Sequence, residues 1–565
     1  MPVTSLDGHP KMARKPTKKT VRARGKPPAE AARTRAGESP ESIDSDEAAS
    51  SDGDVGERDK IVWAGVLLFL YTAIGTWGHF NFADLMGYYD LFADALLAGR
   101  LNIAFHPAQG YIHDMIPFEG RYYIQWGPLP GIFHAIPKIV GLSLSDRVAC
   151  ILTGWLTSLV FLAIMLHLRR RFFPEVSKGV CRWFFFAFAL ATPTAMIALR
   201  GSVYHESIGV GALCILTSLY AFARSVESGS LKWAAVSGAL IGLAMLCRVT
   251  LVFYAPALFI FLALTLYARR RPLPVLLGTL TAFSVPVFLG GGLQMLYNAA
   301  RFGSPWDYGN NYLVDATGEA PFALSRVPEN IKHYLLALPE FKADFPWVEH
   351  VGWTPLVETL RAEDVSSLLL ASPFVLLGLV AWKLVRSESR PLDLRIFFGA
   401  AALGSGTLFL MLLTFASAAR RYTQDFFPVW MVIAFIGFAM WRPPRMPAVA
   451  AKSASWALLA VTMLLHLHLS FTQSFNWDPP DINVMRTFVM WSPAVRSILP
   501  AGERYNTEEA MIRHDMATLA IQARRYREAV AHLQLAAKYM PDEPRIQKNL
   551  ELAQRALERQ RIRNR

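Results

Sequence analysis

The chain has 565 residues, of which 53% are hydrophobic and only 18% are charged, and its mean hydropathy is +0.28. A typical soluble domain has about 25% charged residues, so this composition argues against an ordinary soluble globular protein. The formal net charge is +13, but most Lys and Arg residues lie in the tails and in short segments between apolar runs, where they set membrane topology. We therefore predict no nucleic-acid partner.

The first 60 residues contain no aromatic residue and no apolar periodicity. They are basic at first and acidic later. Such a segment cannot bury enough apolar surface to offset the entropy lost on ordering. We predict that residues 1–60 form a disordered cytoplasmic tail.

Long apolar runs begin at Ile61 and continue to residue 475. A helix that crosses the hydrocarbon core needs about 20 mostly apolar residues, so the sequence predicts an all-α, polytopic membrane protein with about eleven transmembrane helices. A proline-rich apolar stretch at 122–142 is expected to form a broken or re-entrant helix. The predicted spans are 61–80, 147–168, 181–200, 204–223, 232–248, 250–268, 273–297, 366–385, 394–416, 425–441 and 450–470.

Basic residues follow every second predicted span. The connections after the second, fourth, sixth, eighth and tenth spans are all rich in Lys or Arg, which indicates that they face the cytoplasm. The N-terminus is then cytoplasmic, and the C-terminus and two long loops, 81–146 and 298–365, lie on the opposite side. The pattern fits a bacterial inner membrane, with a periplasmic C-terminus.

Residues 476–565 are predicted to form a soluble region, and its part 505–560 resembles a tetratricopeptide repeat. One such unit is too small to be stable alone. We expect these helices to pack on the membrane domain or to bind a protein partner. The matching positions are Ala517, Tyr526, Ala529, Leu533, Ala536 and Pro541.

Ionisable residues gather at the predicted outer ends of the spans, where the positive-inside trend makes arginines rare. Charges at such positions are costly and usually mark a substrate path or a paired site. Snorkelling side chains and structural ion pairs are the alternatives. The residues concerned are His205, Glu206, Arg248, Arg301, Arg420, Arg421, Tyr422 and Asp425.

The first outer loop contains acidic residues at helical spacing. Asp84, Tyr88 and Leu91 would share one face of a helix, as would Asp90 and Asp94. An acidic group just outside the first span is suited to general-base catalysis or to cation binding. A solvated acidic helix is the alternative.

This loop resembles the first-loop motif of the GT-C class of membrane glycosyltransferases, the group of protein mannosyltransferases and aminoarabinose transferases. In that motif an acidic residue, here Asp84, is followed by a tyrosine (Tyr88), an Ala-rich amphipathic helix and a glycine (Gly99). Residues 120–154 resemble the return of that loop, and Arg421 to Pro428 carry a further RY-x-x-D-x-x-P segment. Many relatives have a second acidic residue where this chain has Leu85, and Asp90 is the expected substitute.

The resemblance implies a sugar donor on a polyprenyl phosphate, membrane lipids as surroundings, and a glycan, lipid or protein acceptor. Asp84, with Asp90, would be catalytic, and Asp84 would act as the general base. The resemblance assigns no cofactor and leaves a divalent cation open; His106, His113 and Asp114 are spaced too loosely to predict metal ligands. The residues expected to bind substrate are Tyr88, Tyr123, His205, Glu206, Arg248, Arg301, Arg420, Arg421, Tyr422 and Asp425.

Two other functions are compatible with the same residues. A transporter or flippase of a lipid-linked substrate would place charges near the membrane midplane and show matching halves, and we see neither. A noncatalytic scaffold would depend on the C-terminal helices and would not need Asp84.

Overall fold

The computed structural model describes residues 54–82, 87–104, 115–312, 320–341, 348–349, 361–363, 367–441, 448–477, 505–522 and 524–563. Helices dominate these residues, which confirms the all-α class. Most of the predicted disordered tail lies outside them. However, helix α1 (Glu57–Gly75) begins before Ile61, because the Asp59 carboxylate accepts a hydrogen bond from the Gly56 amide (3.2 Å) and caps its first turn.

Five helical segments in the described residues are long and apolar enough to cross a membrane. Helices α5 (Lys178–Leu190) and α6 (Pro193–Leu199), bent by 57°, would together make a sixth. The protein is therefore an integral membrane protein, whereas the number of eleven spans stays a prediction. The five are α4 (Asp146–Phe172), α7 (Val203–Ser228), η3 (Val249–Phe253) with α9 (Tyr254–Ala268), α10 (Leu273–Phe302) and α15 (Leu392–Thr414).

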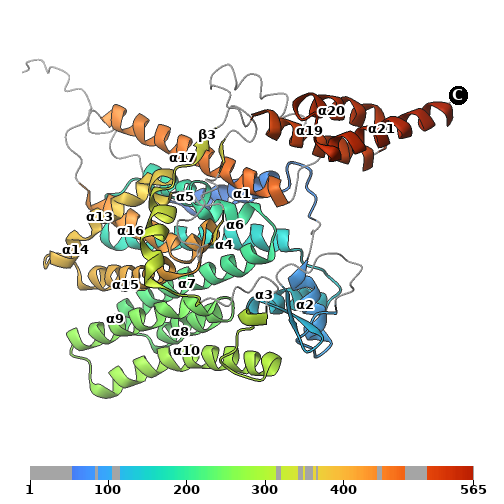
Figure 1. Ribbon diagram of the computed structural model, residues 1–565. Helices are drawn as coiled ribbons and strands as arrows, with labels where there is room; N and C mark the ends of the chain where they lie inside the picture. The colour runs from blue at the N-terminus through green and yellow to red at the C-terminus, as the bar shows by residue number, and fades with distance from the viewer. Residues whose placement is uncertain are drawn as a thin grey trace, which may run out of the picture. The chain divides into compact units, whose positions relative to one another are not determined.

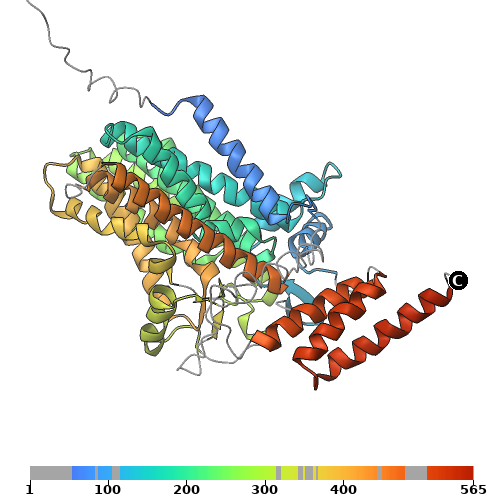
Figure 2. The same cartoon turned by 90° about the horizontal axis from the view of Figure 1, so that it is seen from above.

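Helices α7, α8 (Leu231–Met245) and α10 lie side by side (Figure 1). Small residues allow the close approach of α8 and α10: a Cβ atom added to Gly238 would lie 1.9 Å from the Phe283 carbonyl oxygen, and one added to Gly290 would lie 2.4 Å from Gly242 Cα. Such contacts are typical of membrane helices, which pack without a hydrophobic driving force. On the other side of the bundle, α17 (Ala448–Trp477) runs along α5 and α6 (Figure 2).

The first outer loop folds differently from the expectation. Its residues 115–124 form an antiparallel hairpin of β1 (Met115–Phe118) and β2 (Arg121–Ile124), whose turn has positive φ angles at Glu119 and Gly120. The predicted broken helix at 122–142 is wrong over its first part, and only α3 (Leu129–Lys138) is helical. A turn with two positive φ angles matches the right-handed twist of the strands that it joins. The Glu-Gly pair between short apolar runs was therefore the sequence signal for this hairpin.

Helix α2 (Tyr88–Leu97) begins directly after Gly87, which has a left-handed backbone (φ +59°). The described helix includes Tyr88 and Leu91, and the face that they were predicted to share with Asp84 stays a prediction. Asp84, with residues 83–86, lies outside the described residues, as do His106, His113 and Asp114.

The eighth predicted span, 366–385, consists of four short pieces. Ser372 and Pro373 interrupt the helix because proline supplies no backbone N–H. Helix α16 (Phe427–Met440) covers the tenth predicted span. The four pieces are α12 (Leu368–Ala371), η7 (Pro373–Leu377), α13 (Gly378–Ala381) and α14 (Lys383–Arg386).

The described residues between α10 and α12 form only short elements. Strand β3 (Glu340–Phe341) pairs antiparallel with β4 (Val348–Glu349) there. Strand β5 (Arg361–Glu363) pairs in parallel with β6 (Ser417–Ala419), which follows α15 and precedes η8 (Arg420–Asp425). The other elements between α10 and α12 are η4 (Asn310–Tyr312), η5 (Leu324–Arg326), α11 (Val327–Ile331) and the π-helix η6 (Lys332–Leu336).

The C-terminal helices α19 (Tyr505–Gln522), α20 (Tyr526–Tyr539) and α21 (Pro544–Arg563) pack on one another. Ala517, Ala529, Leu533 and Ala536 are all fully buried in their shared core. Helices occur where the sequence predicts them, and the likeness to a tetratricopeptide repeat stays a prediction.

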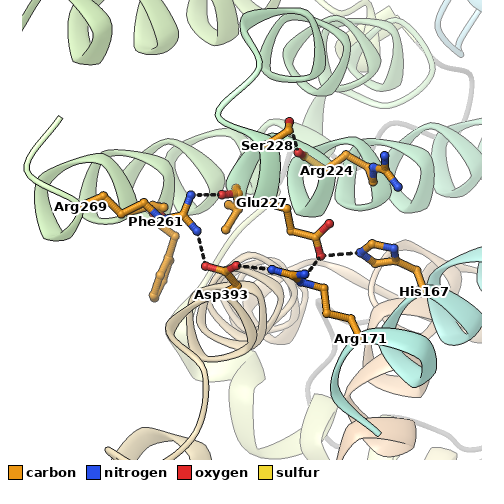
Figure 3. Close-up of polar contacts among 10 residues, drawn as sticks. His167, Arg171, Arg224, Glu227, Ser228, Phe261, Arg269 and Asp393 are labelled. Carbon is orange, nitrogen blue, oxygen red and sulfur yellow. Dashed lines mark hydrogen bonds and ion pairs between the residues drawn. The ribbon is translucent and has the colours of Figure 1, made fainter. Parts of the chain in front are cut away.

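One ion network joins four membrane helices at the ends that carry basic connections (Figure 3). Asp393 on α15 pairs with Arg269 and with Arg171 of α4 (3.4 Å). Glu227 on α7 lies 3.2 Å from Arg171 Nε and 2.7 Å from His167 Nε2. Segments predicted to face the same side of the membrane therefore meet. That this side is the cytoplasm stays a prediction.

Candidate functional site

The other end of α7 carries a series of aromatic contacts. The Trp126 ring, between β2 and α3, lies 4.8 Å from the Tyr204 ring at the start of α7 and 6.2 Å from the Tyr88 ring of α2. Tyr204 and Glu227 stand near opposite ends of this helix of 26 residues. The aromatic contacts are therefore far from the ion network.

Two arginines extend this series. The Arg421 guanidinium lies 4.8 Å from the Tyr204 ring centre and 5.1 Å from that of Tyr422. The Arg248 guanidinium lies 4.9 Å from the same Tyr422 ring, and its Nη2 is 3.1 Å from Oδ2 of the buried Asp425. We call these seven residues the aromatic–arginine row: Tyr88, Trp126, Tyr204, Arg421, Tyr422, Arg248 and Asp425.

Backbone contacts fix Trp126 beside the segment that leads to Arg248. The Gly127 amide donates to the Cys247 carbonyl (3.3 Å), and the Leu129 amide donates to the Leu246 carbonyl (3.2 Å). A Cβ atom on residue 127 would lie 2.0 Å from the Leu246 carbonyl oxygen, so only glycine permits this approach. The Tyr89 hydroxyl donates to the Gly127 carbonyl (3.2 Å) and ties α2 to the same point.

Buried polar atoms without a hydrogen-bond partner gather around the row. Among the described residues they include both ring nitrogens of His205, Arg248 Nε and Thr250 Oγ1. His205 is 1% exposed and interacts electrostatically with Arg200 and Arg421. Nearly all buried polar groups in proteins have partners, so this concentration suits a polar ligand.

Five of the predicted substrate-binding residues lie outside the row: His205 and Glu206, which follow Tyr204 in α7, and Arg301, Arg420 and Tyr123. Arg301 donates to the Ile124 carbonyl (2.8 Å) and to Asn298 Oδ1 (3.0 Å), so it holds the strand that precedes Trp126. Arg420 bonds to His466 of α17 instead. The Tyr123 ring packs edge-on against Phe302, with 5.5 Å between ring centres.

Asp90, predicted to be catalytic, belongs to an ionic contact between α2 and α3. Lys138 Nζ lies 2.8 Å from Asp90 Oδ2 and 2.6 Å from Asp94 Oδ1, and Ser143 donates to Asp90 Oδ1 (2.9 Å). Partial burial lowers the pKa of Lys138, but its hydrogen bonds with the two carboxylates raise that pKa above the usual value. The contact stabilises the packing of the two helices.

Glu206, predicted to bind substrate, is buried next to His134 of α3. His134 Nε2 lies 3.0 and 3.1 Å from the two carboxylate oxygens of Glu206. Sequence reasoning missed His134, Gly127 and Thr250. For Gly127, the Gly-Pro pair that follows an aromatic residue was the available signal.

Residues 132–289 match the family model of dolichyl-phosphate-mannose-protein mannosyltransferases. This match confirms the resemblance to membrane glycosyltransferases over that segment. The matched segment includes Tyr204 and Arg248 and starts after α2. No curated protein sequence matches the chain.

Several solved structures are similar to this chain at low sequence identity. ArnT from Cupriavidus metallidurans bound to undecaprenyl phosphate shares 14% identity, with a TM-score of 0.38 and coverage of 87% of this chain and 75% of that chain. The Archaeoglobus fulgidus oligosaccharyltransferase in the apo form shares 13% identity, with a TM-score of 0.40 and coverage of 80% and 59%. AglB from the same organism, in complex with an inhibitory peptide and a dolichol-phosphate, shares 12%, with a TM-score of 0.38 and coverage of 79% and 59%.

Proposed function

We propose that this protein is a membrane glycosyltransferase that moves a sugar from a polyprenyl-phosphate donor to an acceptor on the non-cytoplasmic face of a bacterial inner membrane. The family match supports the transferase class, since the matched family is named for a sugar on dolichyl phosphate. The acceptor is a glycan, a lipid or a protein. The aromatic–arginine row is the proposed donor site.

The observation that carries the proposal is the position of two guanidinium groups on one tyrosine ring. Arg248 and Arg421 both lie within 5.1 Å of the Tyr422 ring centre, and Asp425 is the carboxylate in ion-pair distance of Arg248. The row therefore brings two guanidinium groups to one place. A planar guanidinium binds phosphate oxygens in pairs, and a preorganised positive charge stabilises a phosphate as it leaves.

The aromatic end of the row suits the sugar. Tyr88, Trp126 and Tyr204 offer ring faces and edges in one continuous series. Such rings bury the apolar face of a sugar while their polar atoms remain available for hydrogen bonds. Asp84, four residues before Tyr88 in the chain, is the proposed general base.

The proposed reaction is a single displacement with inversion. The acceptor oxygen or nitrogen attacks the anomeric carbon and forms the new glycosidic bond, while its proton passes to the Asp84 carboxylate. The bond between the anomeric carbon and the phosphate oxygen breaks, and the lipid phosphate leaves with that electron pair. Arg421 and Arg248 stabilise the negative charge on the phosphate.

The test is transfer by the purified protein across a panel of undecaprenyl-phosphate sugars. We expect Arg421→Gln to lower transfer by about 100- to 1000-fold, and Asp84→Asn to abolish it with normal expression. Arg224→Gln is the matched control, because Arg224 lies 5.8 Å from the Trp233 ring at the far end of α7. Full transfer by either site variant, or transport of the lipid-linked sugar without a glycosyl product, contradicts the proposal.

A further inference from the structure

A chain of hydrogen bonds joins helix α17 to the segment that carries Arg421. Arg420, the first residue of η8, bonds through Nη2 to His466 Nδ1 of α17. His466 Nε2 lies 2.8 Å from Ser372 Oγ, and this hydroxyl donates to the Ala191 carbonyl (2.7 Å). Each of the four bonded residues is at most 1% exposed.

From this chain we infer that His466 is a positioning residue of the proposed donor site: it holds Arg420 in place and thereby directs the neighbouring Arg421. The inference rests on the proposed function, since it gives the hydrogen bonds a role in binding the donor phosphate. It adds α17 to the helices that build the site, although none of the seven residues of the aromatic–arginine row belongs to α17.

The donors and acceptors of this chain allow one arrangement of protons. A guanidinium only donates, so His466 Nδ1 is the acceptor and the imidazole is neutral. The single proton of the Ser372 hydroxyl is directed to the Ala191 carbonyl, so His466 Nε2 carries the imidazole proton and donates to Ser372. The imidazole ring therefore cannot turn over without losing both bonds.

The chain is anchored where two helical segments are interrupted. Ala191 follows the last residue of α5, at the bend of 57° before α6, and Ser372 directly precedes Pro373 of η7. Carbonyls at the end of a helix have no partner within that helix, and unsatisfied ones are costly inside a membrane. The Ser372 hydroxyl satisfies the Ala191 carbonyl, so the anchor of His466 belongs to the packed interior of the bundle.

Arg421 lies between this anchor and two further contacts of η8. The Gln424 amide group is hydrogen-bonded to the Thr194 hydroxyl of α6 (3.2 Å), and the Asp425 carbonyl accepts from a tyrosine hydroxyl of α9 (3.0 Å). These bonds hold the last part of η8, whereas the side chain of Arg420 holds its first residue. Consecutive Cα atoms are about 3.8 Å apart, so a displacement of Arg420 also moves Arg421.

The two adjacent arginines reach different helices. Arg420 bonds to α17, whereas the Arg421 guanidinium lies 4.8 Å from the Tyr204 ring centre of α7. Contact with a ring face constrains a guanidinium less in direction than a hydrogen bond does. The backbone position that His466 sets through Arg420 therefore helps to determine where the Arg421 guanidinium lies.

The test compares two amide replacements of the imidazole. In His466→Asn the amide oxygen takes the place of Nδ1 and accepts from Arg420, whereas in His466→Gln the amide group takes the place of Nε2 and this acceptor is lost. We expect His466→Gln to lower kcat for transfer from undecaprenyl-phosphate sugars by about 100-fold, and His466→Asn to restore most of it. Thr462→Val is the matched control and should transfer at the wild-type rate, because the buried Thr462 hydroxyl bonds to carbonyls of α17 itself.

A fluorine label reads the position of Arg421 without any transfer. Fluorotyrosine incorporated at position 204 carries the label on the ring that the Arg421 guanidinium contacts. The ¹⁹F resonance of His466→Gln should shift toward that of Arg421→Gln, and the resonances of His466→Asn and Thr462→Val should stay at the wild-type position. Arg420→Met removes the same hydrogen bond with an apolar side chain that tolerates burial, and it should give the same shift if His466→Gln does not fold.

The two measurements separate this inference from the proposed function. An unshifted ¹⁹F resonance in folded His466→Gln or Arg420→Met overturns the inference, as does an equal loss of kcat in His466→Asn and His466→Gln. Absence of transfer by the wild type contradicts the proposed function instead, and the ¹⁹F shift then still supports the positioning of Arg421 by His466.

Discussion

The substitution Gly127→Ala tests whether the backbone contact beside Trp126 positions the aromatic–arginine row. The new methyl group would lie 2.0 Å from the Leu246 carbonyl oxygen and 2.6 Å from its carbon. Both are backbone atoms, so no side-chain rotation relieves the clash. Residues 127–129 must move away, and the hydrogen bonds of Gly127 and Leu129 to Cys247 and Leu246 break.

The expected magnitude follows from these contacts. Two lost hydrogen bonds cost about 1–3 kcal/mol of unfolding free energy together, and the clash adds about 1–3 kcal/mol. Movement of Trp126 by about 1 Å should lower transfer by about 100-fold. Thermal unfolding and the donor-panel assay measure the two effects.

Gly292→Ala is the matched control for this substitution. Its Cβ atom would meet no atom within 4 Å on helix α10, so stability and transfer should not fall. The reasoning is refuted if Gly127→Ala unfolds at the wild-type temperature and transfers sugar at the wild-type rate.

Three further predictions concern stability. Asp393→Asn should lower the free energy of unfolding by about 1.5–3 kcal/mol, because Arg171 and Arg269 both lose their shared carboxylate. Ser228→Ala is the control: it loses only two exposed hydrogen bonds, to the Arg224 carbonyl and from the Ser230 amide, and should change Tm little. Equal effects of the two substitutions would refute the role of Asp393. Because the pKa of Lys138 is raised in the folded protein, its contribution is complete below about pH 10.4 and is lost as the pH rises through the folded pKa. The Tm difference between wild type and Lys138→Met should therefore shrink above that pH. A difference that stays constant would contradict a stabilising role of the charged Lys138 side chain. Tyr254→Phe should lower the free energy of unfolding by about 1–3 kcal/mol, because the fully buried hydroxyl donates to the Asp425 carbonyl (3.0 Å). Urea unfolding measures this loss, and unchanged stability would refute the role of the hydroxyl.

The sequence predicts the membrane helices well because an apolar run of sufficient length has few other folds in a bilayer. Helices α4 and α15 begin within two residues of their predicted starts. The prediction of the eighth span is wrong because composition alone does not distinguish a continuous helix from one interrupted at Ser372 and Pro373. The prediction for the first outer loop is wrong at 115–124 because the hairpin there depends on a single Glu-Gly turn.

The sequence indicates many residues of the candidate site, but it does not indicate which of them are in contact. Arg420 and Arg421 are adjacent and equally charged, yet one bonds to His466 and the other lies on Tyr204. Their directions depend on the backbone between β6 and α16, which periodicity does not determine. His134 was not predicted because a single histidine on an apolar helix is usually a core residue, and its contact with Glu206 of α7 joins positions 72 residues apart in the chain.

The ion network of Asp393, Arg171, Glu227 and Arg269 also constrains how the helices that it joins can move. It links four helices near one end, so sliding one helix past another would break these contacts, whereas a tilt about this end would keep them. Helix α7 has 26 residues and is about 39 Å long, so a tilt of about 3° would move its far end by about 2 Å. At the proposed donor site beside Tyr204, a small rotation would therefore be enough to change the space between helices.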